Sequence, residues 1–410
     1  MIPLPLDELR DLGELDGEGE ATGLTIDSRT ATPGDLFVAV RGGRAFVAAA
    51  RARGAATLVP ADEHAALAAI GRALRSRSRA RVVGITGSTG KTSTKDILAA
   101  LCAPVARTVA TSGSENAELG VPLTLGRLEP DTELCIVELG MRGLGQIAVL
   151  CEIARPELAV ITAIGPVHLE LVGSVRGVAR SKAELVHSLP AGGIAVVPRS
   201  AELEPHLLRE DLDVRRVESV DVDFRADGAH VAFLGGRVRF PLTSRHQAQN
   251  ALTALTAYDA LGLPLERLQE AADRVQLSRW RGEEFGLPGG GIAINDAYNA
   301  NPTSMRAALE HLAGLGSERK LAVLGGMAEL GAHAARYHRE IGELADILGI
   351  EVVGVGELAR GYGASTWVAD GPAAAAAVLE LVRPGDAVLV KGSRALALEG
   401  VAPALAKGPG

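Results

Sequence analysis

The sequence predicts an α/β protein of three domains, whose sheets are mostly parallel and covered by helices. Its 410 residues exceed the roughly 250–300 that a single core usually supports. Apolar strands alternate with helices from residue 81 onward, and the same alternation restarts after residue 281. These two observations place the domains at residues 1–80, 81–281 and 282–410.

The first 80 residues predict a small α/β domain. Its polar, turn-rich segment DSRTATPGD lies between two short apolar runs. The expected strands cover 23–26, 36–40 and 57–59, and the expected helices cover 46–53 and 63–74. Arginines at positions 72, 75, 77, 79 and 81 predict a solvated basic connector to the next domain.

The other two domains are predicted to consist of strand–loop–helix units, which favour parallel sheets. In the second domain, strands are expected at 81–86, 134–139, 158–164 and 193–197, with helices at 91–102, 144–153, 175–189, 247–261 and 265–275. Two glycines at 235–236 predict a β-hairpin over 224–240. In the third domain, strands are expected at 291–295, 321–324, 351–355 and 387–390, with helices at 304–313, 333–348 and 372–381.

Charge and hydropathy exclude several classes of protein. The net charge is −8 and no polybasic tail is present, which argues against a nucleic-acid partner. No apolar run reaches the roughly 20 residues of a membrane span, and the acidic start lacks the pattern of a signal peptide. The three cysteines have no metal-site spacing, which predicts buried, reduced thiols. We therefore expect a cytoplasmic protein without a membrane partner.

Lysine and asparagine are scarce, so their positions are informative. Only six of the 42 basic residues are Lys, and the whole chain has five Asn. GC-rich codon usage explains why Lys and Asn are scarce, but it does not explain why the Lys and Asn residues that are present lie in motifs. All five Asn and three of the six Lys lie in the segments singled out below: Asn116, Asn250, Asn295, Asn299, Asn301, Lys91, Lys182 and Lys391.

Residues 84–92, GITGSTGKT, predict a phosphate-binding loop between a strand and a helix. The backbone N–H groups of Gly87, Ser88, Thr89 and Gly90 can surround phosphate oxygens at the start of the helix. Lys91 would reach the outer phosphates, the Thr92 hydroxyl would bind Mg²⁺, and Ser93 would lie beside them. The longer pattern has Gly where Ile85 stands, so a plain turn with a chance Lys is the alternative. No guanine-selecting N-K-x-D occurs, which favours ATP.

Three further residues follow the pattern of an ATPase site. Glu138 ends the apolar strand LCIVE, where an acid can point at the Mg²⁺ of a phosphate-loop enzyme. His168 follows the next strand, in GPVHLE, and Lys182 lies on a helix of mostly apolar and small residues. A surface acid and a structural histidine are the alternative interpretations of Glu138 and His168.

The motifs together resemble those of the Mur ligase family, which includes the folylpolyglutamate and cyanophycin synthetases. The matching segments are GSTGKT, ENAELGVPLT, VELGM, PVHLE, SKAEL and RHQAQNALTA, in this order. The resemblance covers nearly the whole chain and is least exact in the first 80 residues. It implies an ATP-dependent amide ligase with a small N-terminal substrate domain, a central P-loop ATPase domain and a C-terminal Rossmann-like domain.

The resemblance also implies roles for single residues. Thr92 and Glu138 would hold one Mg²⁺, while His168 and a carbamylated Lys182 would hold a second. Only a primary amine takes up CO₂ in this way, which gives a reason for Lys rather than Arg at position 182. His246 and Asn250 would lie near the nucleotide phosphates or ribose, and Asn116 would bind substrate.

One segment narrows the predicted activity. DAYNANPTSM (296–305) resembles the member of the family that adds D-alanyl-D-alanine to a UDP-N-acetylmuramoyl tripeptide, and the D-N-P-R motif of the diaminopimelate-adding member is absent. GGMAELG (325–331), Tyr337-His338 and VKGSRA (390–395) fit the same member. A Mur-type ligase with another amino-acid donor, or a nucleotide-regulated protein that is not a ligase, are the alternatives.

This resemblance assigns the remaining residues of the candidate site. Arg281 would reach the γ-phosphate, and Asp296 would anchor that arginine or the ribose. Adenine contacts are expected from Tyr298, Asn299 and Asn301, and substrate contacts from Ser28, Arg29, Lys391 and Ser393. The segment VRGGRAFVAA (40–49) departs from the family because it is short and lacks D-G-H-x-F. We expect a monomer that forms an acyl phosphate before the amide.

Overall fold

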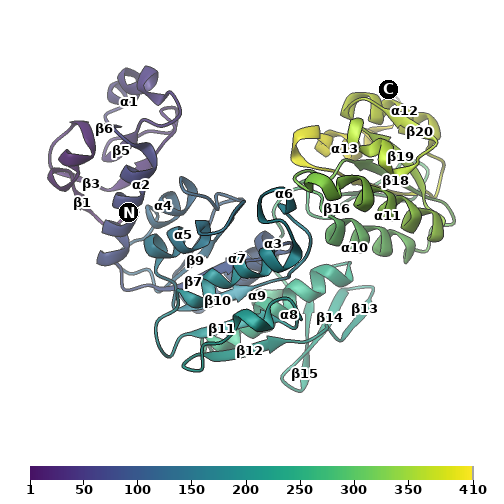
Figure 1. The fold of residues 1–410 in the computed structure, drawn as a ribbon, viewed down its shortest axis with the longest axis horizontal. Coiled ribbons are helices and arrows are strands. Elements are labelled where there is room, and N and C mark those ends of the chain that lie inside the picture. The colour runs from purple at the N-terminus through teal and green to yellow at the C-terminus, as the bar shows by residue number, and fades with distance from the viewer. Residues whose placement is uncertain (409–410) are drawn as a thin grey trace.

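A computed structural model of the protein describes residues 1–408 and shows three lobes along the chain (Figure 1). The N-terminal lobe has a four-stranded sheet with the order β2-β6-β5-β4, beside the small pair β1 and β3. Its strands are β1 (Leu4–Pro5), β2 (Gly13–Asp16), β3 (Glu20–Ala21), β4 (Gly23–Thr25), β5 (Asp35–Val38) and β6 (Ala56–Pro60); its helices are α1 (Val47–Ala52) and α2 (Glu63–Arg77).

The prediction of a solvated basic connector over residues 72–81 is wrong for most of that segment. Helix α2 continues to Arg77, so that Arg72, Arg75 and Arg77 belong to the helix. Arg75 donates to the carbonyl of Ala154 at 2.9 Å and pairs with Glu157 at 3.0 Å. Arginine is a good helix former, and these contacts dock the last turn of the helix on the central lobe. Only residues 78–80 connect the two lobes.

The central lobe contains a six-stranded parallel sheet with the order β12-β11-β10-β7-β9-β8. The strands are β7 (Arg81–Thr86), β8 (Thr108–Ala110), β9 (Leu134–Glu138), β10 (Leu158–Ile161), β11 (Ile194–Pro198) and β12 (Asp213–Val217). Helices α3 (Lys91–Cys102), α8 (Arg245–Ala260) and α9 (Leu268–Ala272) cover one face; α4 (Gly120–Leu125), α5 (Gln146–Ala154) and α7 (Val175–His187) cover the other, where α2 joins them. All three cysteines of this lobe are buried.

A small antiparallel sheet is attached to this lobe. The predicted hairpin is confirmed as β14 (Gly228–Phe233) and β15 (Gly236–Phe240), and β13 (Val222–Arg225) adds a third strand. Its turn has Leu234 at φ 47° and Gly235 at φ 78°, the left-handed pair that suits a two-residue hairpin.

The C-terminal lobe contains a second six-stranded sheet, with the order β16-β17-β21-β18-β19-β20. Only β16 is antiparallel to its neighbour. The strands are β16 (Glu283–Gly286), β17 (Ile292–Asn295), β18 (Lys320–Gly325), β19 (Glu351–Val355), β20 (Thr366–Val368) and β21 (Ala387–Lys391); the helices are α10 (Pro302–Ala313), α11 (Ala334–Ile347), α12 (Gly371–Leu381) and α13 (Val401–Lys407). The predicted α/β class with mostly parallel sheets is confirmed.

The loops at the carboxyl ends of these two sheets contact each other. The loop after β7 meets the loop after β17, where the Asn301 amide donates to the Ser88 carbonyl at 3.4 Å. A ligand held at these strand ends would therefore touch both lobes. No helix within residues 1–408 combines the length and apolar character needed to cross a membrane.

Candidate functional site

The glycine loop turns from β7 into α3 and is held by contacts of Gly90, Ser88 and Thr89 with other elements. Gly90 lies at φ 83°, and a Cβ there would come 2.2 Å from the Asn250 Oδ1 on α8. The Ser88 hydroxyl donates to the Gly165 carbonyl and accepts from the Gly165 N–H, both at 3.0 Å. Thr162 donates to the Thr89 carbonyl at 2.5 Å. Contacts from other elements therefore hold this loop before any ligand arrives.

A chain of hydrogen bonds joins most of the residues predicted to act on phosphate. The Lys91 ammonium donates to the Gly87 carbonyl at 2.8 Å. The Thr92 hydroxyl donates to Glu138 Oε2 at 2.8 Å and accepts from the Arg281 guanidinium at 2.8 Å. Burial lowers the pKa of Lys91 and nearby Arg281 adds to this, while Glu138 opposes it. The structure thus brings Lys91, Thr92, Glu138 and Arg281 to one place.

The acid of this cluster can serve as a metal ligand. Glu138 is buried, with one carboxylate oxygen bonded to Thr92 and the other to the Asn116 amide at 2.7 Å. Carboxylate and hydroxyl oxygens are hard ligands of the kind Mg²⁺ takes. Thr92 and Glu138 could therefore hold a Mg²⁺ ion, which would supply positive charge beside a bound phosphate. Asn116, predicted to bind substrate, instead holds the Glu138 carboxylate in this structure.

Lys182 lies on α7 and is almost completely buried, with 2% of its surface exposed. Burial, reinforced by the charge of Lys91, lowers its pKa well below the usual value. The amine is therefore stabilised in its neutral form, which is the form that reacts with CO₂.

His168 meets an acid from the C-terminal lobe that the sequence analysis did not single out. Its Nδ1 lies 2.5 Å from Glu329, although the two groups are not aligned for a hydrogen bond and the contact is electrostatic. Burial lowers the pKa of His168, and Glu329 opposes that shift. Both residues have left-handed backbones, with φ of 51° and 62°. Glu329 lies in the motif GGMAELG, but nothing in the sequence indicated that it would contact His168.

Two residues of the C-terminal lobe with predicted ligand roles pair with each other in this structure. Asp296 was expected to anchor Arg281 or the ribose, but its carboxylate pairs with Lys391 at 2.6 Å. Lys391 was expected to bind substrate, but only 2% of its surface is exposed, and it also donates to the Asn299 carbonyl at 3.0 Å. The pair fixes the loop after β17 because each charge is buried against the other. Arg281 instead stacks on the Tyr298 ring, 4.0 Å from its centroid.

Asn301, predicted to contact adenine, caps helix α10 in this structure, and its adenine contact stays a prediction. Its Oδ1 accepts from the Ser304 N–H at 2.9 Å, at the start of α10, and its amide reaches Ser88. Asn followed by Pro is a common way to begin a helix, so the sequence did carry this signal. Asn299 is exposed, with its Oδ1 bonded to the N–H of Ala300 at 2.8 Å. The predicted adenine contacts of Tyr298 and Asn299 stay predictions.

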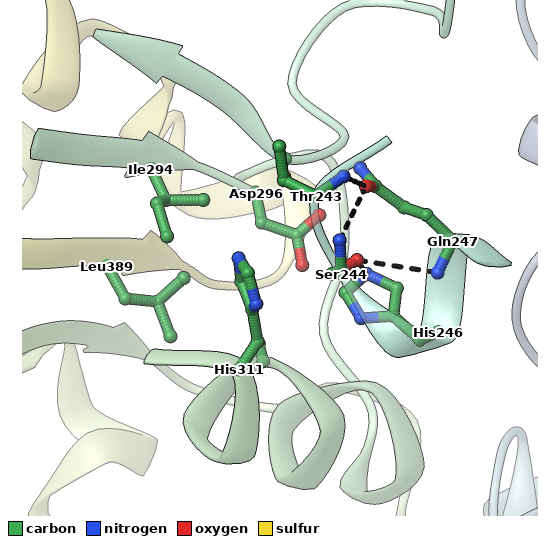
Figure 2. Close-up of a pocket in the computed structure, with 10 residues that line it drawn as sticks. Thr243, Ser244, His246, Gln247, Ile294, Asp296, His311 and Leu389 are labelled. Carbon is green, nitrogen blue, oxygen red and sulfur yellow. Dashed lines mark hydrogen bonds between the residues drawn. The ribbon is translucent and has the colours of Figure 1, made fainter. Parts of the chain in front are cut away.

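A pocket lies between α8 and the C-terminal sheet, and Figure 2 shows its lining side chains. The half-buried His246 ring lies 6.4 Å from the ring of His311, which was not predicted. Burial lowers the pKa of His246 to about 4, so the ring is neutral at physiological pH. Its Nδ1 finds no hydrogen-bond partner in the described part of the chain. The pocket lining is Thr243, Ser244, His246, Gln247, Gly282, Ile294, Asp296, Ala308, His311 and Leu389.

The other predicted substrate residues lie outside this cluster. Ser28 is buried in the turn after β4, and Arg29 is exposed and pairs with Asp27 at 2.7 Å. That pairing lowers the pKa of Asp27 to about 2. The shortened segment forms a 3-10 helix, Gly43–Phe46, that leaves Phe46 56% exposed. Ser393 bonds through its N–H to Gly326 at 3.2 Å.

Comparison with known proteins agrees with this arrangement. The family model "Mur ligase middle domain" matches residues 85–258, and the model "Mur ligase, glutamate ligase domain" matches residues 280–394. A UDP-N-acetylmuramoyl-tripeptide–D-alanyl-D-alanine ligase of Escherichia coli K12 is 33% identical, with 99% of both chains covered. MurF from Acinetobacter baumannii superposes with a TM-score of 0.86 at 29% identity, covering 99% of each chain.

A second solved structure adds a bound nucleotide. MurF ligase from Thermotoga maritima, in complex with ADP, has a TM-score of 0.83 and 26% identity, with 94% of this chain and 97% of that chain covered. The similarity therefore extends across all three lobes, including the N-terminal lobe that neither family model reaches. The chain belongs to the Mur ligase family.

Proposed function

We propose that the chain is an ATP-dependent ligase that joins D-alanyl-D-alanine to UDP-N-acetylmuramoyl tripeptide in peptidoglycan synthesis. The observation that carries the proposal is the hydrogen-bonded chain from Glu138 through Thr92 to Arg281. It links a phosphate loop to a residue at the edge of the next domain, as a phosphoryl-transfer site shared by two domains requires. The E. coli relative with this activity is similar over its whole length.

The proposed reaction has two steps. A carboxylate of the tripeptide attacks the γ-phosphate of ATP, giving an acyl phosphate and ADP. The amine of D-alanyl-D-alanine then attacks the acyl carbon, and phosphate leaves as the amide forms. Phosphoryl transfer of this kind depends on positioning and charge neutralisation, which Lys91 and Arg281 supply. Water has to be excluded because it would hydrolyse the acyl phosphate.

Each domain is proposed to hold one substrate. Residues 1–80 would bind the UDP-muramoyl tripeptide through Ser28 and Arg29, residues 81–281 the triphosphate, and residues 282–410 the dipeptide and the adenine side. His246 and Asp296, which line the pocket of Figure 2, would lie on the ribose side of the nucleotide. Asn250 would stay beside the phosphates, because it packs against Gly90.

Two Mg²⁺ ions would neutralise charge on the transferred phosphoryl group. Thr92 and Glu138 supply oxygen ligands for one; His168 and a carbamylated Lys182 would hold the other. The neutral state favoured for Lys182 supports carbamylation, because CO₂ adds to an unprotonated amine. ATP and a UDP-linked substrate are cytoplasmic metabolites, so we place the enzyme in the cytoplasm.

The test is phosphate release from ATP by the purified full chain. Release should require both UDP-N-acetylmuramoyl tripeptide and D-alanyl-D-alanine, with the pentapeptide product seen by mass spectrometry. Glutamate or diaminopimelate in place of the dipeptide should give none. Release with the tripeptide and another amino acid, but not with D-alanyl-D-alanine, would refute the proposal.

A further inference from the structure

The backbone that carries Arg281 has no regular structure of its own. It runs from the end of α9 at Ala272 to the start of β16 at Glu283. The Arg281 side chain donates to Thr92 and stacks on the Tyr298 ring, while its Nε has no hydrogen-bond partner among residues 1–408. How far the guanidinium reaches toward a bound phosphate also depends on what fixes the preceding backbone.

Asp96 fixes that backbone. Its carboxylate accepts a hydrogen bond from the Ser278 N–H at 2.8 Å, three residues before Arg281. Asp96 and Thr92 are four residues apart on α3, so they lie on one face of the helix. The stretch between α9 and β16, here called the connecting segment, therefore touches the same face of α3 twice, at Ser278 and again where Arg281 bonds Thr92.

Asp96 is itself immobilised. Its second carboxylate contact is with Lys95 at 2.5 Å, and the two side chains are only 11% and 5% exposed. Lys95 also donates to the Thr111 carbonyl at 2.9 Å, at the end of β8. A second hold on the segment comes from α8, where the Gln247 amide donates to the Arg281 carbonyl at 3.2 Å.

We infer that Asp96 is a positioning residue for the ligation: through the Ser278 N–H it holds the connecting segment so that Arg281 reaches the transferred phosphoryl group. This inference rests on the role proposed above for Arg281. Asp96 acts on the transferred group only through Arg281, so its loss should change turnover more than nucleotide affinity.

The experiment is a double-mutant cycle of Asp96→Ala and Arg281→Ala, with steady-state ligation and ADP binding as readouts. Displacing a catalytic group by about 1 Å costs on the order of 100-fold, so Asp96→Ala should lower kcat about 10- to 100-fold. ADP affinity should change about twofold or less. In the Arg281→Ala background, Asp96→Ala should have little further effect. Unchanged kcat, or the same fold loss in both backgrounds, overturns the inference.

Rescue and control variants separate this role from simple stabilisation. Asp96→Asn keeps an oxygen that can accept the Ser278 N–H and should recover most of the turnover. Asp273→Asn is the matched control, because this acid lies at the start of the same segment but pairs with Arg239 at 2.8 Å. Its kcat should equal that of the unaltered chain.

A backbone variant covers the case in which Asp96→Ala does not fold. Replacing the peptide bond before Ser278 by an ester removes the N–H and leaves the Lys95–Asp96 pair intact. The same loss of kcat is expected, and an unchanged kcat overturns the inference. If the unaltered chain itself shows no substrate-dependent phosphate release, the proposed function fails; if it ligates normally and the variants do too, only the role of Asp96 fails.

Discussion

The buried amine of Lys182 leads to a prediction about stability and pH. Its pKa is ordinarily 10.5 and is lowered well below that value in the folded chain, chiefly by burial. Between these two pKa values the unfolded chain carries one more proton at Lys182 than the folded chain. Stability should therefore rise with pH across this window, by up to ~1.4 kcal/mol per pH unit from this group alone.

The perturbation is Lys182→Met, which keeps a chain of similar length and volume but cannot ionise. Guanidinium denaturation in CO₂-free buffer between about pH 7 and 9 gives the free energy of unfolding of both proteins. Between pH 7 and 9, the free energy of unfolding of the unaltered chain should rise by up to about 2.7 kcal/mol more than that of Lys182→Met. Lys91, whose pKa is also lowered, is present in both proteins, so the difference between them reports the Lys182 amine together with its interaction with Lys91.

The same variant tests the chemistry. Lys182→Met should lose ligation by at least about 1000-fold, because no carbamate can form to complete the proposed metal site. Lys182→Arg should be inactive and also destabilised by about 3–5 kcal/mol, because a guanidinium cannot lose its charge when buried without a partner. Parallel stability curves for the unaltered chain and Lys182→Met would refute the buried neutral amine. Normal turnover of Lys182→Met would refute the carbamate.

Three further predictions concern the phosphate loop, the cap of helix α10 and His246. Gly90→Ala should abolish ADP binding in calorimetry, because position 90 has a φ of 83° and the new Cβ would lie 2.2 Å from the Asn250 Oδ1. Gly262→Ala is the control. Position 262 is also strained, at φ 68°, but has open space around it, so this variant should bind ADP normally. Asn301→Ala should cost about 1 kcal/mol in thermal unfolding through loss of the cap, whereas Asn301→Asp should keep that stability; equal losses would contradict the capping role. The pKa of His246 is lowered to about 4, so the ring stays neutral around the ordinary histidine value of 6.5. The dependence of ADP affinity on pH near 6.5 should therefore be the same for the unaltered chain and for His246→Gln.

Elements with a strong local signal were predicted well from the sequence. Strand β7 and helix α3 begin and end where expected, because an apolar run, a glycine loop and a helix-forming stretch follow one another. Edge strands were missed for the opposite reason. Strand β12 has the sequence DVRRV, and only its last residue is buried. No apolar pattern marks it, and only pairing with β11 makes it a strand.

In the candidate site too, residues marked by a local sequence pattern were predicted, and residues brought together only by contacts between lobes were not. Lys91, Thr92 and Glu138 were found because each stands at a fixed place relative to a strand end. Contacts between lobes left no trace in the local sequence, so Glu329 beside His168 and His311 beside His246 were not found. Scarcity marked Lys391 and Asn301 correctly as constrained residues, but it could not tell a ligand from a structural contact.

The buried cysteines make the chain convenient for distance measurements. Burial raises the pKa of Cys102, Cys135 and Cys151 to about 12, so the native thiols stay protonated and slow toward maleimides at neutral pH. Two engineered surface cysteines, one on each of two lobes, could then carry a fluorescent donor and acceptor without replacing any of the three native cysteines. Energy transfer between the dyes would report how far the lobes move as each substrate binds.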